Sequence, residues 1–329
     1  MIPQESLLVT LVKLVDRIPM PLPPAKRKRG KPKFYPDDLF LKALVIMIVR
    51  HLNHVHELLS VLEQPTAEMQ GLRALLTEQG RYPCRRTWER RLKAIPSTLP
   101  AQIACLGGYL VTVIQPWASC GRAAAADSTL LRAQGGVWHK KDREQGIVPH
   151  TSIDTQAAWG KSGWHGWVYG WKLHVVATVA AVWIPLAAYL TPASVADNDE
   201  AVILALWHDL PPELRFILGD LHYNAPNVRR VCEQAGYILV TSQYGPYPHA
   251  DDGKEVRRIL HKLRSLTIEN FNEHFKGIFD GHSQLPTKGL INTQRFALGA
   301  IFVYQLALLY RFEHGLSLRV GLKAFLKAA

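Results

Sequence analysis

The sequence RAAAADSTLLR, residues 122–132, contains four consecutive alanines followed by a polar Asp-Ser-Thr triplet that begins at Asp127. A short apolar run of this kind is typical of a strand buried within a sheet, and here it stops at an acid. The arrangement recurs in RFILGD, residues 215–220, where a short apolar strand ends on Asp220. A carboxylate at such a strand end has a fixed backbone and is partly removed from water, which suits a ligand of Mg²⁺.

The segments around these two strands alternate between strand and helix patterns. Aromatic and β-branched residues predict further strands at 169–182, 183–193 and 237–244. Helices are predicted at 196–210 and 224–236, from about 255 to 280 and from about 292 to 313. Three strands followed by helix, strand, helix and strand describe a mixed α/β sheet covered by helices. We therefore predict an α/β domain over residues 116–329.

Residues 1–115 are predicted to form a separate helical region. One of its helix patterns, TAEMQGLRALLTEQG, is expected to end at Gly80, and a later one, YPCRRTWERRLKAIP at residues 82–96, is strongly basic. Several short helices followed by a basic helix suit a helix-turn-helix-like bundle whose last helix enters a DNA major groove.

The charge of the chain indicates a polyanionic partner, which is nucleic acid or an acidic membrane surface. The formal net charge is +12, and residues 1–100 hold 17 Lys and Arg against 9 Asp and Glu. The predicted DNA contacts in this part are Lys26, Arg27, Lys28 and Arg29 in the basic run, and Arg85, Arg86, Arg90 and Arg91 in the basic helix. The alternative for both groups is a solvated arm and a solvated helix face.

Cysteine usage and hydropathy indicate the cellular compartment in which the protein works. The four cysteines are widely separated and have no metal-ligand spacing, which fits a reducing bacterial cytoplasm. The longest apolar runs are shorter than the roughly 18 residues that a membrane-spanning helix needs. We therefore expect buried helices, a soluble protein and no membrane partner.

A third acid is expected on the helix RSLTIENFNEHFKGIF, residues 264–279. Glu269 and Lys276 are seven residues apart, two turns along one helix face. Glu273, one turn after Glu269, is an alternative for the same role. We favour Glu269 because an isoleucine precedes it and a lysine follows seven residues later.

Four blocks in this order resemble the DDE transposases of bacterial insertion sequences, whose catalytic domain is RNase H-like. The blocks are DST at 127–129, YGWKLH at 169–174, GDLHYNA at 219–225 and the Arg/Glu/Lys helix from Arg264 to Lys276. The resemblance covers roughly residues 115–320. One departure is that four residues separate Arg264 from Glu269, where the family's helix often has three. Another is that His261 stands where some relatives have a tyrosine.

The resemblance implies an RNase H-like fold in which Asp127, Asp220 and Glu269 bind two Mg²⁺ ions, with Mn²⁺ as a substitute. It also implies that Arg264 and Lys276 contact the DNA backbone near the cleavage site. Tyr223 and Lys172 match the family's pattern and are expected beside the DNA.

Several other polar residues have simpler explanations. Asp197, Asp199 and Glu200 are interpreted as the acidic start of a helix, and His222 as a surface histidine. The segment 133–166 mixes Gly, Trp, His and Lys without periodicity and is predicted to be a long functional loop. A tryptophan there, such as Trp164, is a candidate for stacking on an exposed base, although core packing is the alternative.

These observations predict a DNA transposase. We expect it to bind the terminal inverted repeats of its element, cleave at the ends and join the 3′-OH to target DNA by two-metal phosphoryl transfer. Pairing of two ends implies a homodimer when active. The alternatives are a nuclease of the same fold that only hydrolyses DNA, and a catalytically silent DNA-binding derivative.

Overall fold

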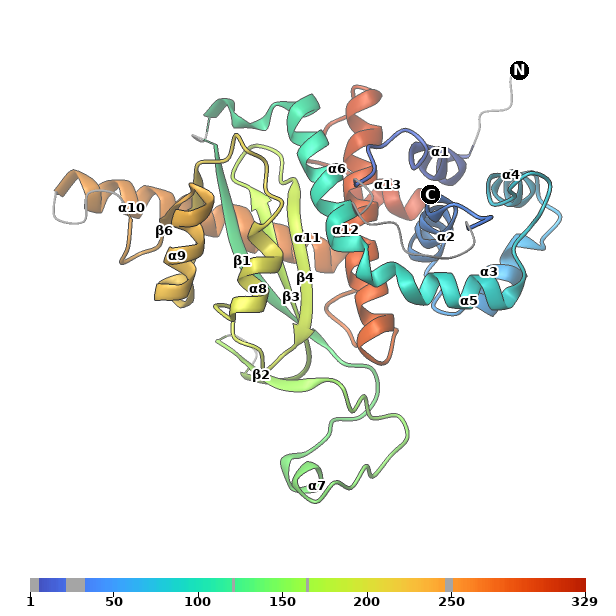
Figure 1. Ribbon diagram of the computed structural model, residues 1–329, viewed down its shortest axis with the longest axis horizontal. Coiled ribbons are helices and arrows are strands. Elements are labelled where there is room, and N and C mark those ends of the chain that lie inside the picture. Colours follow the sequence, from blue (N-terminus) through green and yellow to red (C-terminus); the bar gives the residue numbers. More distant parts are fainter. Residues whose placement is uncertain (1–5, 22–32, 120–121, 164–165, 246–250) are drawn as a thin grey trace.

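A computed structural model describes residues 6–21, 33–119, 122–163, 166–245 and 251–329. The basic run that holds Lys26, Arg27, Lys28 and Arg29 lies outside these residues, and so does Trp164. The described part has a sheet at its centre, with helices from the beginning and the end of the chain packed beside it (Figure 1).

The N-terminal region is helical, as the sequence predicts. Its helices are α1 (Leu7–Leu14), α2 (Asp37–Val49), α3 (Val55–Leu62), α4 (Ala67–Leu75), α5 (Arg85–Ala94) and α6 (Leu99–Ile114). Side chains at the helix starts satisfy free backbone N–H groups: the hydroxyl of Ser6 accepts from Val9 N, and that of Thr66 from Met69 N. Helix α4 stops at Leu75 and not at Gly80, because Glu78 and Arg81 form a tight backbone-bonded turn after it.

The sheet has six strands: β1 (Ala123–Arg132), β2 (Ala158–Ser162), β3 (Gly166–Thr178), β4 (Pro185–Pro192), β5 (Phe216–Leu218) and β6 (Ile238–Val240). β3 runs antiparallel to β1, β2 and β4, whereas β5 is parallel to both β1 and β6. The spatial order β4–β3–β1–β5–β6 is that of an RNase H-like sheet. The predicted fold class, a mixed α/β sheet flanked by helices and preceded by a helical region, is confirmed.

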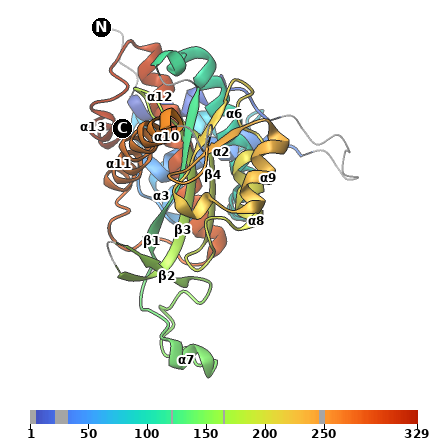
Figure 2. The same cartoon turned by 90° about the vertical axis from the view of Figure 1, so that its left-hand side faces the viewer.

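Helices cover both faces of the sheet (Figure 2). On one side lie α8 (Glu200–Trp207) against β3 and β4, and α9 (Pro226–Ala235) against β6. On the other lies one long helical segment, which consists of α10 (Asp251–Arg264), a π-helical turn (Ser265–Glu269, labelled η4) and α11 (Asn270–Ile278). The π-helical turn packs against β1 and β3, so it faces the centre of the sheet.

Helix α12 (Leu290–Glu313) joins the N-terminal helices to the sheet. It packs against α1, α2, α5 and α6, and also against β4. By length and hydropathy it could cross a membrane, yet 78% of its most apolar window is buried inside the protein. The short helix α13 (Leu322–Ala328) follows it. The apolar run in this helix therefore forms the centre of a core that extends from α1 to the sheet.

The predicted loop at 133–166 contains two elements that the sequence pattern did not reveal. They are the short helix α7 (Lys140–Glu144), on an arm that projects from the body, and β2, which pairs with the start of β3. The predicted strand at 237–244 is also shorter than expected, because only Ile238–Val240 pairs with β5. Strand β2 was missed because a five-residue edge strand with Gly160 at its centre has almost no periodic signal.

Candidate active site

Asp127 lies in the middle of β1, and not at the strand's end as predicted. β1 continues to Arg132 because its whole length pairs with β3. On its other side, β1 pairs with β5 only from Ala123 to Ala125, since β5 stops at Leu218. One edge of β1 is therefore left without a strand partner just before Asp127. This opening beside a buried strand is where a charged side chain can reach solvent.

Asp220 lies beside this opening. Ala125 of β1 pairs in parallel with Leu218 of β5. Asp127 follows Ala125 by two residues and Asp220 follows Leu218 by two residues, so both acids lie at the same level of the sheet. Asp220 begins a short 3₁₀ turn: one carboxylate oxygen accepts from the His222 backbone N at 2.9 Å, and the other lies 2.9 Å from His222 Nδ1. The Asp220 carboxylate raises the pKa of His222. The sheet thus brings together two of the predicted acids.

The environment of Asp127 favours its neutral form. About a fifth of its side chain is exposed (21%), and burial raises the pKa of this carboxyl to about 7. The Arg264 guanidinium opposes this shift, whereas the charges of Asp220 and Asp197 reinforce it. Asn272, from α11, donates its side-chain N–H to Asp127 Oδ2 at 3.4 Å. Asn272 was not recognised from the sequence, where one asparagine on a helix has no distinguishing signal.

Arg264 connects Asp127 to Glu269. Its Nη1 is 4.0 Å from Asp127 Oδ2, and its Nη2 donates to Glu269 Oε1 at 3.0 Å. The Arg264 side chain is buried, with 8% of its surface exposed, whereas 57% of the Glu269 side chain is exposed. The third predicted acid is therefore linked to the first through a cation that the protein itself supplies.

The π-helical turn explains how Arg264 and Glu269 meet with four residues between them. A π turn inserts one extra residue into an α-helix, so residues five apart lie about one turn apart. Arg264 precedes the turn and Glu269 is its last residue. The five-residue separation of Arg264 and Glu269 is accommodated by this inserted residue, and α11 continues with its apolar residues against the core.

Glu273 lies in a different environment from Glu269. Its Oε1 accepts from Lys276 Nζ at 3.2 Å, and its Oε2 lies 3.8 Å from His282. Lys276 is nearly buried, with 10% of its side chain exposed. Glu269 shares an arginine with Asp127, whereas Glu273 pairs with the lysine that was expected to contact DNA.

Asp197 pairs with two residues of β3 and does not cap a helix, contrary to its interpretation as a helix-start acid. That interpretation holds for Asp199, which caps α8 by accepting from Ala201 N at 3.0 Å. Asp197 Oδ1 instead lies 3.3 Å from Lys172 Nζ and 3.4 Å from His174 Nδ1. In the sequence, the signal for an acidic partner is Lys172, a charged side chain on a largely apolar strand.

The Asp197 cluster, which comprises Asp197, Lys172 and His174, lies on the other face of the sheet from Asp127. In the register of β1 and β3, Asp127 is opposite Val175 and shares its face, whereas Lys172 and His174 point the other way. Lys172 also donates to Val195 O at 2.8 Å, so its charge is committed inside the protein. Burial lowers the pKa of His174 to about 4, which keeps this imidazole neutral.

Tyr223 packs beneath the acids and is fully buried. Its ring stacks on Trp207 with 6.4 Å between centroids. Its hydroxyl has no hydrogen-bond partner among the described residues, and burial together with the charges of Asp197, Asp127 and Asp220 raises the pKa of the phenol. The ring expected beside the DNA is therefore part of the core in this structure.

The fit of a metal ion to these residues is partial. Asp127 and Asp220 supply carboxylate oxygens, which are suitable donors for Mg²⁺. Among the described residues, however, no group of three or more His, Cys, Asp or Glu side chains is arranged to hold a metal ion. The third carboxylate, Glu269, is engaged by Arg264, which occupies the side of Asp127 that faces α11.

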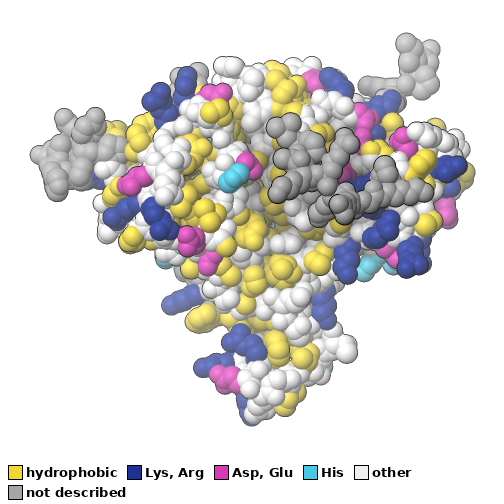
Figure 3. All heavy atoms as spheres, in the orientation of Figure 1, with side chains coloured by type: hydrophobic (Ala, Val, Ile, Leu, Met, Phe, Trp, Pro, Cys, Tyr) yellow, Lys and Arg dark blue, Asp and Glu magenta, His cyan; other side chains and the backbone are white. Residues whose placement is uncertain are grey.

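The predicted DNA-contacting arginines of α5 divide into two groups. Arg85, Arg86 and Arg90 are exposed. Arg91 points inward: its guanidinium lies 4.3 Å from the Phe40 ring centroid, donates to Tyr35 O at 3.1 Å and pairs with Asp37. Arg91 thus holds α5 on α2. Other Lys and Arg side chains are spread over the surface, including the arm that carries α7 (Figure 3).

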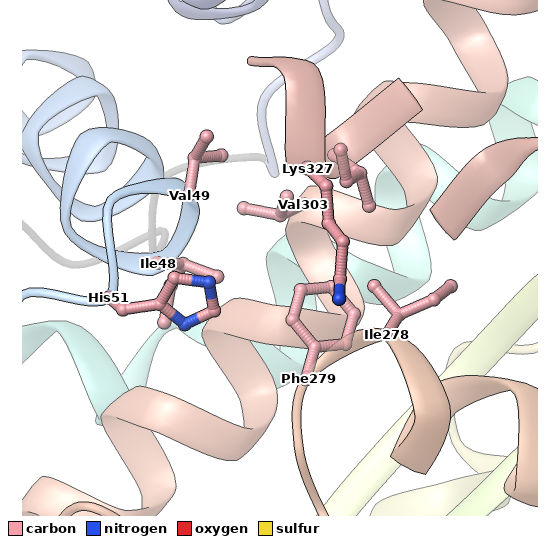
Figure 4. A pocket seen from close by; sticks show the side chains of 8 residues that line it. Ile48, Val49, His51, Ile278, Phe279, Val303 and Lys327 are labelled. Carbon is pink, nitrogen blue, oxygen red and sulfur yellow. The ribbon is translucent and has the colours of Figure 1, made fainter. Parts of the chain in front are cut away.

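A pocket elsewhere in the described protein offers no comparable chemistry. It lies between α2, the end of α11, α12 and α13, and Figure 4 shows mainly apolar side chains, together with His51 and Lys327. No acid lines it. The clustered carboxylates at the β1–β5 opening are therefore the better candidate for a functional site.

The chain matches no protein-family model, and no curated protein matches it. It is similar to a solved structure of a pre-cleavage Mos1 transpososome, with 14% sequence identity, a TM-score of 0.22, and coverage of 85% of this chain and 80% of that chain. It is also similar to the Mos1 transposase paired-end complex with left transposon end and to the Mos1 strand transfer complex. The paired-end complex is 15% identical, with coverage of 88% of this chain and 80% of that chain and a TM-score of 0.21. The strand transfer complex is 15% identical, with coverage of 86% of this chain and 80% of that chain and a TM-score of 0.22.

Proposed function

We propose that the protein is a DNA transposase of the DDE type. It binds the terminal inverted repeats of its own element, cleaves the DNA at the ends and joins the released 3′-OH to target DNA. The observation that supports this most is the placement of Asp127 and Asp220 side by side where β5 ends on an RNase H-like sheet, with Glu269 linked to them through Arg264.

In this proposal the acids hold divalent cations at the β1–β5 opening. Asp127, Asp220 and Glu269 hold Mg²⁺ or Mn²⁺, which when bound activates the attacking hydroxyl and stabilises the leaving oxygen of a phosphodiester. Water is the nucleophile for cleavage, and the 3′-OH is the nucleophile for joining. Asn272 orients the Asp127 carboxylate through its side-chain N–H. The active form is a homodimer, since two DNA ends must be paired. It acts in the bacterial cytoplasm.

The exposed basic face of α5 supplies DNA contacts outside the acid site. Arg86, Arg90 and Lys93 are spaced by four and three residues, so they line one exposed face of the helix. Trp88 and Leu92 on the opposite side are fully buried and anchor the helix in the core. A rigid helix with three cations in a row suits the phosphate backbone, which binds through charge and independently of base sequence.

The test compares the wild-type protein with Asp220→Asn on DNA that carries the ends of the element, with and without Mg²⁺ or Mn²⁺. Cleavage and joining to a target plasmid are both measured. The matched control is Asp209→Asn, which alters an exposed Asp–His pair outside the site. The carboxylate of Asp209 lies 2.7 Å from His208 Nδ1, and that of Asp220 lies 2.9 Å from His222 Nδ1. We expect metal-dependent cleavage and joining in the wild type and in Asp209→Asn, and neither in Asp220→Asn, with end binding retained by all three.

Three outcomes would contradict the proposal. Cleavage without joining would identify a nuclease of the same fold. End binding without any metal-dependent cleavage by the wild type would identify a silent DNA-binding protein. Equal activity of Asp220→Asn and wild type would remove Asp220 from the catalytic centre.

A further inference from the structure

Arg264 has an unusual position for an arginine. Its side chain is 8% exposed and reaches two carboxylates from different elements, Asp127 of β1 at 4.0 Å and Glu269 of the π-helical turn at 3.0 Å. Its Nε has no hydrogen-bond partner among the described residues. A buried guanidinium normally uses its whole planar fork, so this one is held by charge more than by a complete set of hydrogen bonds.

Arg264 lies between two acids that come from different elements. Its guanidinium reaches Asp127 and Glu269, and Asn272 donates to the same Asp127 oxygen at 3.4 Å. Lys172 is the nearest other cation to Asp197, but it is on the other face of the sheet. On the face of Asp127, the cation that lies between this carboxylate and Glu269 is the guanidinium of Arg264.

The π-helical turn makes this arrangement possible. Because one residue is inserted between Arg264 and Asn270, Glu269 reaches back over a full turn to Arg264 while α11 keeps Asn272 against Asp127. π turns in otherwise regular helices are frequent at functional sites.

We propose that Arg264 is an internal counter-ion that holds the place of a divalent cation between Asp127 and Glu269, and that a metal ion binds by displacing its guanidinium. The inference rests on the proposed function, since it takes these carboxylates as the cation site. It assigns Arg264 a second task besides contact with DNA. It also accounts for the partial fit, because the third carboxylate becomes available only when Arg264 leaves it.

The test measures binding of Ca²⁺, which occupies oxygen-ligand sites, to the full-length protein by calorimetric titration without DNA. We expect Arg264→Gln to bind Ca²⁺ about tenfold more tightly than wild type, since a neighbouring cation changes a carboxylate's equilibrium by about that factor or more. Arg264→Lys, whose single ammonium cannot span both carboxylates, is expected between the two. Arg230→Gln removes an exposed arginine that is paired with Glu200 at 3.0 Å, and is expected to match wild type.

Thermal unfolding of the same proteins provides a second readout. Without metal, Arg264→Gln leaves the acids uncompensated and is expected to melt at a lower temperature than wild type. Ca²⁺ should then raise its melting temperature by more than that of wild type. If Arg264→Gln does not fold without metal, Arg264→Lys supplies both measurements.

The outcomes separate this inference from the proposed function. If wild type binds Ca²⁺ at a site that Asp127→Asn abolishes, but Arg264→Gln binds it equally or more weakly, the counter-ion inference is wrong and the cation site stands. If wild type shows no binding that depends on Asp127, the cation site itself is wrong, and the catalytic centre proposed above fails with it.

Discussion

In this protein, the exposure and the pKa of an ionisable side chain depend more on its place in the fold than on its residue type. Asp127 and Glu269 are both acids of the predicted triad, yet Asp127 is largely enclosed and has its pKa raised to about 7, while more than half of the Glu269 side chain is exposed. The same holds for Arg90 and Arg91, which are adjacent in the sequence: one faces solvent and the other packs on Phe40. Neighbouring residues on a helix point about 100° apart, so identical side chains meet different surroundings.

His174 provides a prediction about pH at this scale. Its pKa is lowered from 6.5 to about 4 by burial, so the unfolded chain takes up a proton at a pH where the folded protein does not. Stability from this residue is present above pH 6.5 and is lost as the pH falls toward 4. We expect wild type to lose more stability than His174→Gln between pH 7 and pH 4.5, by on the order of 2 kcal/mol.

Urea unfolding at the two pH values measures this difference. His174 Nε2 lies 2.9 Å from Thr191 Oγ1, and the glutamine amide can keep a hydrogen bond to that hydroxyl. Exposed His208→Gln is the control and should follow wild type. An equal loss of stability in His174→Gln and wild type would show that the buried imidazole is protonated as readily as a free one.

Among the elements, the π-helical turn is the feature that links sequence spacing to the site. It absorbs one residue between α10 and α11, and a one-residue deletion inside it should convert it to a regular α-helix. We expect deletion of Leu266, which is 54% exposed, to leave the melting temperature equal to or above that of wild type. Arg264 and Glu269 would then be four residues apart and still in contact.

The matched control is deletion of Glu273 in α11, outside the π-helical turn. That deletion rotates the following residues by about 100° and turns Phe275 and Ile278, both buried, away from the core. We expect it to lower the melting temperature strongly or to prevent folding. Comparable destabilisation by both deletions would mean that the extra residue is required for the fold and is not an absorbed insertion.

Helix α5 provides a second prediction at this scale. The triple variant Arg86→Ala, Arg90→Ala, Lys93→Ala removes three exposed cations from one face. We expect its DNA affinity to depend less steeply on salt, with the slope of log K against log salt reduced by about 0.9 for each phosphate that the helix no longer neutralises. The control removes two exposed, ion-paired arginines elsewhere, Arg17 and Arg230, and should leave the slope unchanged.

At the scale of the whole molecule, the helical region and the sheet share one core. Gln305 of α12 is fully buried and donates to Ile103 O of α6 and to Pro185 O at the start of β4, both at 2.8 Å. One side chain thus joins α12, the N-terminal region and the edge of the sheet. The amide satisfies two backbone carbonyls that would otherwise be buried without a partner.

Two adjacent glycines of α6 test this junction. A Cβ at Gly107 would lie 2.6 Å from Pro185 O and 3.1 Å from Gln305 Nε2, whereas a Cβ at Gly108 would have no atom within 4 Å. We expect Gly107→Ala to destabilise the protein by about 2 kcal/mol through overpacking. Gly108→Ala should stabilise it by up to about 1 kcal/mol, because alanine favours a helix.

Denaturant unfolding measures both changes, and the pattern of the transition carries further information. If the two regions share a core, Gly107→Ala shifts a single transition for the whole chain. A transition that splits into two, with one part unchanged, would show that the N-terminal helices unfold independently of the sheet.

Most of the secondary structure could be predicted from local patterns. The alanine run of β1, the aromatic and β-branched residues of β3 and β4, and the Gly236 stop after α9 are all where the sequence placed them. These signals depend on side-chain periodicity and backbone preference, which are properties of neighbouring residues. The three candidate acids, Asp127, Asp220 and Glu269, could likewise be identified from the sequence.

Contacts between distant residues could not be read in this way. Where β1 loses its β5 partner, which acid faces Lys172 and His174, and which arginine packs on Phe40 all depend on pairings between segments far apart in the chain. The π-helical turn could not be predicted locally either. Its extra residue disturbs the regular helix, and the contacts that offset this disturbance are those of Arg264 and Asn272 with Asp127 on another element. The residue sequence thus specified most of the elements and the acids that they carry, and the packing of one element on another set the burial and the partner of each acid.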